Sequence, residues 1–303
     1  MIPQPPQDAP KTPKPDWLKV RFPSHADYFS VSSLLEGGGL RTICRSALCP
    51  NIAECWTGRT ATFLILGPSC TRACAFCAVE KGGPAAPDPA EPEAVASAAA
   101  GLGLSYAVVT SVTRDDLPDG GAGQFVRTMR ALRRRIPGVR IEILVPDFGG
   151  RPGPLAEVLA EKPDVLGHNL ETVERIYPSI GRERAAYRRS LEVLRRAGEA
   201  GPATKSGLMA GLGETHGEMR DALADLREAG CGLLTLGQYL RPTRRHPAPA
   251  RYLPPEEFAG LKEDALALGF AGVEAGPLVR SSFHAQALYA TLRDSRKGTA
   301  CGT

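Results

Sequence analysis

The sequence predicts an α/β protein built on a complete or partial parallel barrel. From Thr60 onward, short apolar runs rich in Val, Ile, Leu and Thr alternate with longer stretches whose apolar residues recur every three or four positions. Strands and helices that alternate in this way are typical of βαβ units and a parallel sheet. Six or seven such units fit a barrel better than a short open sheet.

Seven apolar runs are predicted strands, and the stretches between them contain clear helical patterns. The strands are expected over 61–67, 106–111, 141–146, 165–170, 206–211, 233–238 and 270–276. Helices are expected over 123–136, 185–200 and 216–230. The strands end in polar sequences, such as GPSCTR after the first and HNLET at the end of the fourth. Because parallel barrels carry their active sites at the carboxyl ends of the strands, we expect the chemistry at this edge.

The segments that flank this alternating region have a different character. Residues 1–15 are rich in proline and are predicted to be disordered or extended, because proline removes backbone donors without building a core. Residues 16–58 show little regular periodicity and are predicted to be organised more by bound ligands than by their own apolar surface. We therefore expect this N-terminal extension, a barrel over 59–275 and a C-terminal extension over 276–303.

Composition and charge are those of a globular protein. The chain has 303 residues, 43% of them hydrophobic and 23% charged, with a net charge of +4. This charge does not require a nucleic-acid partner, and the basic run RALRRRIPGVR (130–140) fits a solvated helix face or, as an alternative, a dock for an acidic carrier. We see neither a secretory signal nor a run of about 18 apolar residues. We therefore expect a cytoplasmic protein without membrane contact, whose cysteine clusters serve as metal ligands or catalytic thiols.

Six of the eight cysteines fall into two groups of three. The second group is Cys70, Cys74 and Cys77, spaced C-x3-C-x2-C just after the first predicted strand. Thiolates are soft ligands that suit iron–sulfur clusters or zinc, but a structural zinc site needs a fourth protein ligand. No Cys or His follows Cys77 at ordinary zinc-finger spacing. Three cysteines could hold a cubane cluster with one iron open to a small molecule; a zinc loop and a chance spacing are the alternatives.

This second cysteine group, with Phe76 before its last member, resembles the radical S-adenosylmethionine (SAM) superfamily. The resemblance implies a 4Fe-4S cluster whose open iron chelates SAM. It also implies that reductive cleavage of SAM gives a radical that abstracts hydrogen from carbon. Phe76, Asn169 and Glu171 are the expected cofactor-binding residues, although Asn169 and Glu171 could instead cap a loop.

The first cysteine group is Cys44, Cys49 and Cys55, spaced C-x4-C-x5-C. One interpretation is a structural zinc or a few buried thiols. The other is a second, auxiliary cluster, which would need a fourth ligand from elsewhere in the chain or would keep an open iron. The spacing by itself does not decide between them.

Both cysteine groups together are similar to the lipoyl synthase family. Further blocks look like that family, and the similarity spans about residues 14 to 286; examples are CPNIAECW (49–56), VTSVTRDDLPDGGA (109–122), KSGLMAGLGET (205–215) and AGPLVRSSFHA (275–285). The resemblance implies insertion of two sulfur atoms at C6 and C8 of an octanoyl chain on a lysine of a lipoyl carrier domain. It further implies two 4Fe-4S clusters, with the auxiliary one as sulfur donor, an electron donor such as a flavodoxin or ferredoxin, and an Fe-S carrier for rebuilding.

The resemblance also suggests the fourth ligand of the auxiliary cluster. In this family an Arg-Ser-Ser-Tyr stretch supplies a serine, and the matching residues here are 280–283, with Phe283 in place of the usual Tyr. Ser282 is the predicted ligand and Ser281 is the alternative. Without the resemblance, the serine pair would be interpreted as an N-cap. A hard oxygen ligand should hold iron loosely, which fits a cluster that is dismantled to donate sulfide.

Two other functions remain open at this point. One is a different radical SAM sulfur-inserting enzyme that acts on a free substrate, and the other is a non-enzymatic zinc or Fe-S binding module. Five further residues are expected to be structural or at the surface: Cys231, Cys301, His168, His246 and His284.

Overall fold

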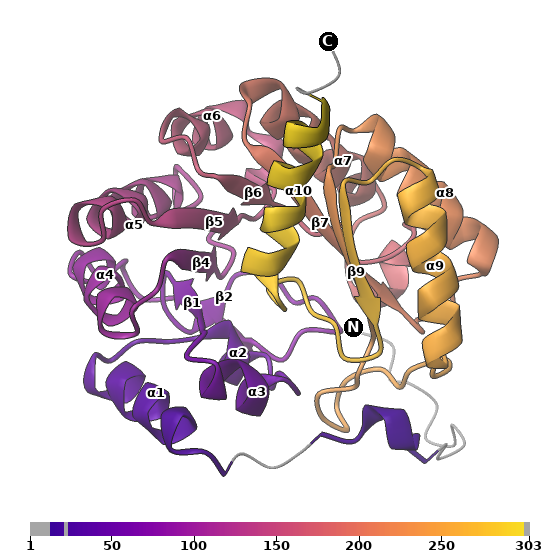
Figure 1. The fold of residues 1–303 in the computed structure, drawn as a ribbon, viewed down its shortest axis with the longest axis horizontal. Helices are drawn as coiled ribbons and strands as arrows, with labels where there is room; N and C mark the ends of the chain where they lie inside the picture. Colours follow the sequence, from indigo (N-terminus) through magenta and orange to yellow (C-terminus); the bar gives the residue numbers. More distant parts are fainter. Residues whose placement is uncertain (1–12, 21–23, 300–303) are drawn as a thin grey trace.

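The computed structural model describes residues 13–20 and 24–299, so most of the proline-rich N-terminus and Cys301 lie outside the described residues. Its centre is a seven-stranded sheet with the strand order β1-β4-β5-β6-β7-β8-β9, and all neighbouring strands are parallel. Within the described chain β1 and β9 are the two edges of this sheet, which therefore forms a partial barrel (Figure 1). The strands are β1 (Thr62–Ile65), β4 (Tyr106–Ser111), β5 (Arg140–Leu144), β6 (Val165–Gly167), β7 (Ala203–Ala210), β8 (Leu233–Gln238) and β9 (Gly272–Gly276).

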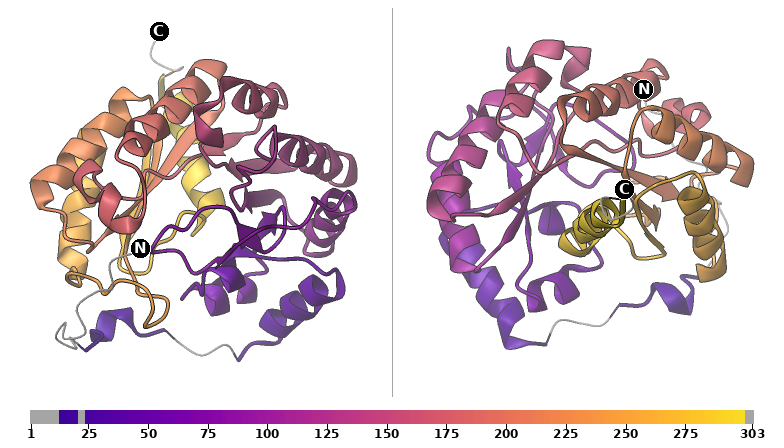
Figure 2. Two further views of the ribbon diagram at one scale, coloured as in Figure 1. Left: turned by 180° about the vertical axis from the view of Figure 1, so that it is seen from behind. Right: turned by 45° about the horizontal axis from the view of Figure 1, so that its top comes forward.

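Six helices form the outer layer around this sheet, one after each of its strands except β9 (Figures 1 and 2). They are α4 (Glu91–Gly101), α5 (Ala122–Arg135), α6 (Pro152–Ala160), α7 (Ala185–Ala200), α8 (His216–Glu228) and α9 (Pro255–Ala267). In α5, buried Phe125, Met129 and Leu132 recur at helical spacing and face the core. Thr215 and Glu218 start α8 with a capping box. The predicted alternation of strands and helices is confirmed.

The N-terminal segment has more regular structure than the sequence predicts. It forms η1 (Asp16–Leu18), α1 (Ala26–Gly37), α2 (Ile43–Ser46) and α3 (Ile52–Thr57). Val31, Leu35 and Trp56 are buried in the same core cluster as β1, and the rings of Tyr28 and Trp56 lie 5.3 Å apart. The expectation that ligands, more than its own apolar surface, organise this segment is therefore wrong. A short parallel pair, β2 (Ser69–Cys70) and β3 (Glu80–Lys81), was also not predicted.

The last helix, α10 (Ala285–Thr299), packs at the amino end of the barrel. Leu288 joins Val165 and Leu233, the first residues of β6 and β8, in one apolar cluster. The ring of Tyr289 lies 5.7 Å from that of Tyr106, the first residue of β4. Because α10 occupies this end, the opposite, carboxyl end of the strands is left for a functional site.

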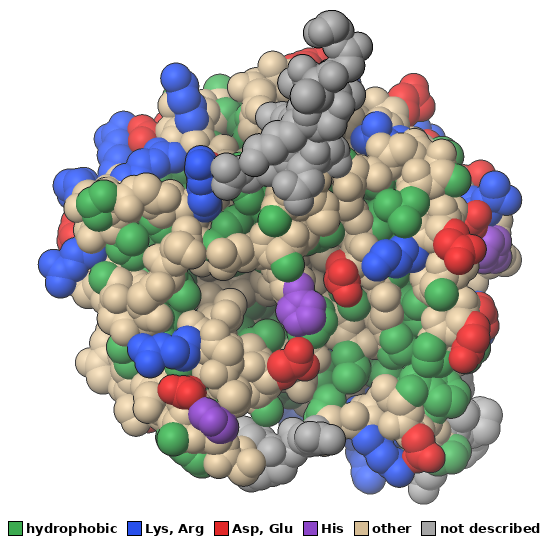
Figure 3. All heavy atoms as spheres, in the orientation of Figure 1, with side chains coloured by type: hydrophobic (Ala, Val, Ile, Leu, Met, Phe, Trp, Pro, Cys, Tyr) green, Lys and Arg blue, Asp and Glu red, His purple; other side chains and the backbone are tan. Residues whose placement is uncertain are grey.

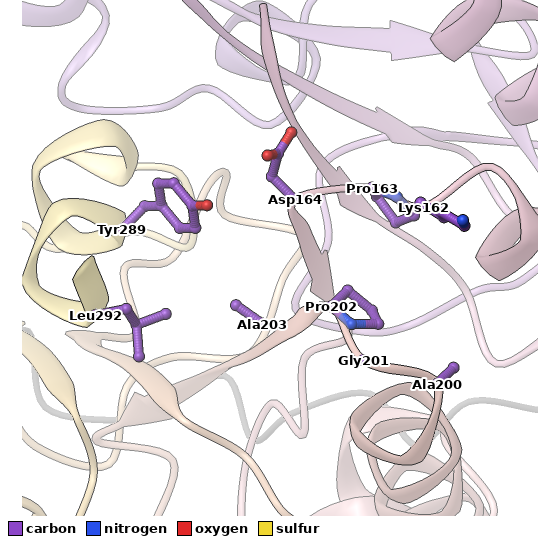
Figure 4. A pocket seen from close by; sticks show the side chains of 9 residues that line it. All are labelled: Lys162, Pro163, Asp164, Ala200, Gly201, Pro202, Ala203, Tyr289 and Leu292. Atoms are coloured by element: carbon purple, nitrogen blue, oxygen red, sulfur yellow. The ribbon is translucent and has the colours of Figure 1, made fainter. Parts of the chain in front are cut away.

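A separate cavity of about 390 Å³ lies beside α10. Figure 4 shows Tyr289 and Leu292 facing Asp164 and Ala203 across it. None of its described lining residues is a cysteine or a histidine, so it offers no thiolate or imidazole ligand.

The basic run of α5 is a solvated helix face, as the first of the two interpretations has it. Figure 3 shows Lys and Arg side chains gathered on the side of the molecule where α5 and α6 lie. Arg130 and Arg133 form ion pairs with Glu161, and Arg134 pairs with Glu93. Among the described residues, no helix is long and apolar enough to cross a membrane.

Candidate active site

Both cysteine groups lie at the carboxyl end of the barrel, around two adjoining cavities. The larger cavity, of about 500 Å³, is lined by Cys44 and Cys49 of the first group, and by Cys77 of the second. The C-terminal residues 280–282 complete its wall. The smaller cavity, of about 170 Å³, is lined by Cys70, Cys74 and Cys77. Segments that are more than 200 residues apart in sequence therefore meet in one place.

Three predicted cofactor-binding residues form the boundary between the two cavities. Phe76, Asn169 and Glu171 line both of them. Of the ten predicted site residues only Cys55 lines neither cavity, but it packs against the same core as Cys44. The structure thus gathers the predicted residues, although it contains no ligand that would test the role of each.

The thiols within each group lie close enough to influence one another's charge. Burial is the largest cause that raises the pKa of Cys55 to about 12, and the neighbouring Cys44 and Cys49 thiolates contribute to this value. Burial likewise raises the pKa of Cys77 to about 11, with Cys74 as a contributing neighbour. A bound cation reverses this trend, because coordination deprotonates a thiol. Each group is therefore a set of three soft donors that a bound metal centre would convert to thiolates.

The arrangement suits a multinuclear cluster better than a single metal ion. Among the described residues, no three Cys, His, Asp or Glu side chains converge as tightly as one metal ion requires. Three thiols around a cavity are the donor set that Fe-S clusters take from proteins. The residues present therefore fit the implied clusters on the chemistry of their donors.

The loop that carries the second cysteine group is tied to the ends of β4 and β5 by Arg72. Its Nε and Nη2 donate to the Asp115 carboxylate at 2.8 and 2.9 Å, and Nη2 also donates to Asp147 Oδ1 at 2.6 Å. Arg189 Nε lies 2.9 Å from Asp147 Oδ2, in an ion pair whose N–H is not aligned for a hydrogen bond. Burial alone would raise the pKa of Asp147, but Arg72 outweighs it and holds this pKa well below its usual range. The clamp leaves the Cys70 thiol accepting hydrogen bonds from two backbone amides, at 3.4 and 3.3 Å.

Glu171 and Arg182 place a negative and a positive group at the smaller cavity. Glu171 has a φ of +71°, a conformation that non-glycine residues rarely adopt and that often marks functional sites. Burial raises the pKa of Glu171, while Arg182 lowers it. Arg182 Nη1 is buried and has no hydrogen-bond partner among the described residues, and its guanidinium lies 5.3 Å from the Tyr177 ring. Sequence reasoning missed Arg182, because no motif surrounds it.

The hydroxyls of Ser281 and Ser282, in the C-terminal turn, differ in their hydrogen bonding. Asn169 Nδ2 donates to Ser281 Oγ at 2.9 Å, whereas the Ser282 hydroxyl lines the larger cavity and makes no hydrogen bond in the described structure. Because α10 begins at Ala285, the residue before it is His284, and neither serine takes the N-cap position. Phe283 stacks on His284 with 3.8 Å between ring centroids.

The remaining candidates behave as structural residues. His168 is buried between Val145 O at 2.8 Å and Ser190 Oγ at 3.0 Å, and burial lowers its pKa to about 4. His246 Nε2 lies 3.1 Å from the backbone oxygen of Cys77. Cys231 is fully buried in the turn before β8, as expected of a small apolar residue.

Comparison with known proteins gives the class of this fold and site. Residues 64–226 match the Radical SAM superfamily, which is more than half of the chain. The crystal structure of Streptococcus suis SuiB bound to S-adenosylmethionine has a TM-score of 0.53 at 11% identity, covering 72% of this chain and 50% of that one. This structural likeness shows a shared fold. The family match over residues 64–226 shows that the chain is a radical SAM enzyme.

Closer relatives identify the family. A lipoyl synthase of Symbiobacterium thermophilum is 53% identical over 294 residues, covering 96% of this chain and 92% of the relative. A lipoyl synthase of Mycobacterium avium is 52% identical over 282 residues, covering 93% and 92%. The chain belongs to the lipoyl synthase family, a group of radical SAM sulfurtransferases, and both predicted resemblances are confirmed.

Proposed function

We propose that the enzyme inserts sulfur at C6 and C8 of an octanoyl chain amide-linked to a lysine of a lipoyl carrier domain. The observation that carries this proposal is the larger cavity, which both cysteine groups and Ser282 line together. Each sulfur atom must be donated to the same carbon from which hydrogen has been abstracted, so the two sites have to share one space. Ile43, Val108 and Leu144 supply apolar wall for an acyl chain.

The two cysteine groups take different roles in this proposal. The second group would hold the cluster that binds SAM, and the first group with Ser282 would hold the auxiliary cluster. When bound, the clusters and SAM supply hydrogen abstraction from carbon and the sulfur atoms. The free Ser282 hydroxyl supports its assignment as the fourth ligand, because the Ser281 hydroxyl is already engaged by Asn169.

The other residues at the edge of the two cavities would position the second cysteine group and SAM and would compensate their charge. Arg72 fixes the loop that presents the second cysteine group. Arg182 offers an unpaired guanidinium to the carboxylate of SAM, a pairing in which the planar fork of arginine is effective. Glu171 and the Asn169 amide are placed to bind polar groups of SAM, and Phe76 packs between the two cavities.

The domain boundaries and partners follow from the same proposal. Residues 16–58 and 276–303 serve as extensions that complete the auxiliary site beside a barrel over 59–275. The reductant is an electron carrier such as a flavodoxin or ferredoxin, and an Fe-S carrier rebuilds the auxiliary cluster after turnover. We propose a cytoplasmic location, since these partners and reduced thiols belong to that compartment.

Anaerobic reconstitution with iron and sulfide, followed by assay with SAM and an octanoyl-lysine peptide, tests this function. The chain should bind about eight irons, two clusters of four, and should add two sulfur atoms to the peptide. Tightly bound zinc without iron would contradict the whole proposal. Turnover of free octanoate but not of the peptide would contradict the carrier substrate.

Two cysteine variants separate the roles of the groups. Cys74→Ala should abolish 5′-deoxyadenosine formation, because SAM then has no cluster to bind. Cys49→Ala should keep 5′-deoxyadenosine formation with the peptide present and lose the sulfur-containing product. Chromatography of both products after matched reconstitution makes the comparison, and circular dichroism checks folding. The opposite pattern would reverse the assignment.

A further inference from the structure

Arg280 is a cation without a carboxylate partner at the wall of the larger cavity. It lies in the turn between β9 and α10, two residues before Ser282. Its Nη1 donates to the backbone oxygen of Val279 at 2.6 Å, and it makes no other hydrogen bond and no ion pair with the described residues. The remaining N–H donors of a guanidinium, which carries five, are therefore unused.

Two other cations inside the described structure have carboxylate partners. Arg72 pairs with Asp147, and Lys205 Nζ lies 2.7 Å from Glu142 Oε1. An interior charge without a counter-charge is unfavourable, so proteins pair such groups or use them to bind ligands. Arg280 is thus placed for an anion that the described residues do not supply.

The charged neighbours of Arg280 indicate which anion this is. Arg280 lines the larger cavity together with Cys49 and Ser282, two of the proposed ligands of the auxiliary cluster. Lys14, whose pKa is lowered first by burial and then by Arg280, adds a second cation on this side. A cluster ligated by three thiolates and a serine oxygen is net negative, because its four anionic ligands outweigh the charge of the core.

We propose that Arg280 is a positioning residue that compensates the negative charge of the auxiliary cluster and raises its reduction potential. The inference rests on the proposed function, since it requires a cluster on the first cysteine group. Reduction adds one negative charge, so a neighbouring cation stabilises the reduced form more than the oxidised form. Net charge near a cluster is one of the factors that set its potential.

The two unpaired arginines of the site are divided between the two cysteine groups. Arg182 lines the smaller cavity and lowers the pKa of Cys74, which burial raises. Arg280 lines the larger cavity and its charge acts on Cys49. Arg182 is therefore the matched control, because its replacement removes the same charge from the other side of the rim.

The test is a redox titration of the reconstituted full-length chain, followed by electron paramagnetic resonance. SAM addition identifies the SAM-binding cluster, and the signal that SAM leaves unchanged is assigned to the auxiliary cluster. Arg280→Met should lower the auxiliary potential by about 60 mV, a tenfold change in a one-electron equilibrium. Arg280→Lys should bring the auxiliary potential most of the way back to the wild-type value, and Arg182→Met should leave this potential unchanged.

The outcomes of this titration test the role of Arg280 and the proposed function separately. A chain with about eight irons and an unchanged auxiliary potential in Arg280→Met overturns the inference and leaves the proposed function intact. If the wild-type chain binds only about four irons, there is no second cluster, and the proposed ligand assignment fails together with the inference. Weakened SAM binding in Arg280→Met without a change in auxiliary potential would assign Arg280 to the SAM site and overturn the inference.

A second measurement applies if Arg280→Met does not assemble the auxiliary cluster. The rate at which a chelator removes auxiliary iron is then compared between Arg280→Lys and Arg280→Gln. Because lysine keeps the charge, iron loss should be about tenfold slower in Arg280→Lys, equivalent to about 1.4 kcal/mol. Equal rates would overturn the inference.

Discussion

Asp147 is the buried anchor of the loop that carries the second cysteine group, and replacing it tests that clamp. Its side chain is 0% exposed and lies 2.6 Å from Arg72 Nη2. Asp115 accepts from the same guanidinium at 2.8 Å, but its side chain is 41% exposed. The two carboxylates share Arg72, but Asp147 is buried and also pairs with Arg189, whereas Asp115 is exposed. Asp115→Asn is therefore the control, because it removes an exposed partner from the same guanidinium.

The expected magnitudes follow from this difference. Removing one partner of a buried ion pair destabilises a protein by about 3–5 kcal/mol, because the other charge stays buried. Asn keeps the shape and one acceptor, so the lower end, about 3 kcal/mol, applies to Asp147→Asn. An exposed pair contributes about 0–1 kcal/mol. With about 2–4 °C per kcal/mol, Asp147→Asn should lower the melting temperature by about 6–12 °C and Asp115→Asn by less than about 4 °C.

The pH dependence gives a second, independent signature. Arg72 holds the pKa of folded Asp147 below the value of about 3.9 that an aspartate has in an unfolded chain. A depressed folded pKa contributes stability that is complete above the unfolded pKa and is lost as the pH falls through the folded pKa. The difference between the wild type and Asp147→Asn should therefore be constant from about pH 5 to 7 and shrink below about pH 4.

Thermal unfolding of the cluster-free chain by circular dichroism, recorded under identical buffer and scan conditions, measures both effects. Equal shifts for the two variants would show that burial does not distinguish the carboxylates and would refute the reasoning. A gap that widened as the pH fell below about 4 would refute the sign of the pKa shift.

Three further substitutions probe other parts of the site. Ser282→Cys replaces a hard ligand with a soft one, so the auxiliary cluster should form, resist breakdown and donate less sulfur, as followed by iron content and peptide mass. Lys205→Met leaves buried Glu142 unpaired and should destabilise the chain by about 3–5 kcal/mol in denaturant, and adding Glu142→Leu should recover most of this loss. In Gly237→Ala the new Cβ would lie 2.0 Å from a backbone oxygen of the C-terminal turn. This change should reduce auxiliary iron, whereas Gly260→Ala, with no atom within 4 Å, should not.

The barrel could be predicted because its signals are local and strong. The strand bounds of β4 and β8 are the predicted ones, since each strand is rich in Val, Leu and Thr and almost entirely buried, as a sheet covered on both faces requires. The N-terminal helices were missed because their signals are weak. In the twelve residues of α1 only Val31 and Leu35 are buried, and the N-cap is His25, a residue that rarely takes this position.

The two cysteine groups of the site could be predicted, because the cysteines of each group are close together in the sequence. Cysteine spacing gives the two groups, but it says nothing of the charges that surround them. Arg72 lies inside the second group, yet its pairing with Asp147 spans 75 residues and depends on the barrel. Arg182 and Arg280 are distinguished from the surface arginines by lining the two cavities, and this placement exists only in three dimensions.

Contacts of the C-terminal turn explain how the proposed auxiliary site could keep its shape when iron leaves. Asn51, which lies between two cysteines of the first group, donates through Nδ2 to Leu278 O at 2.6 Å. Asn169, at the barrel rim, donates to Ser281 Oγ at 2.9 Å. These amides hold the turn on both sides, so Ser282 is placed at the cavity by protein contacts alone. A cluster that is dismantled for its sulfur needs a site that persists when iron leaves. Hydrogen bonds that do not involve the proposed ligand residues meet this requirement. A turn held only by the serine–iron bond would instead be released with the first iron lost.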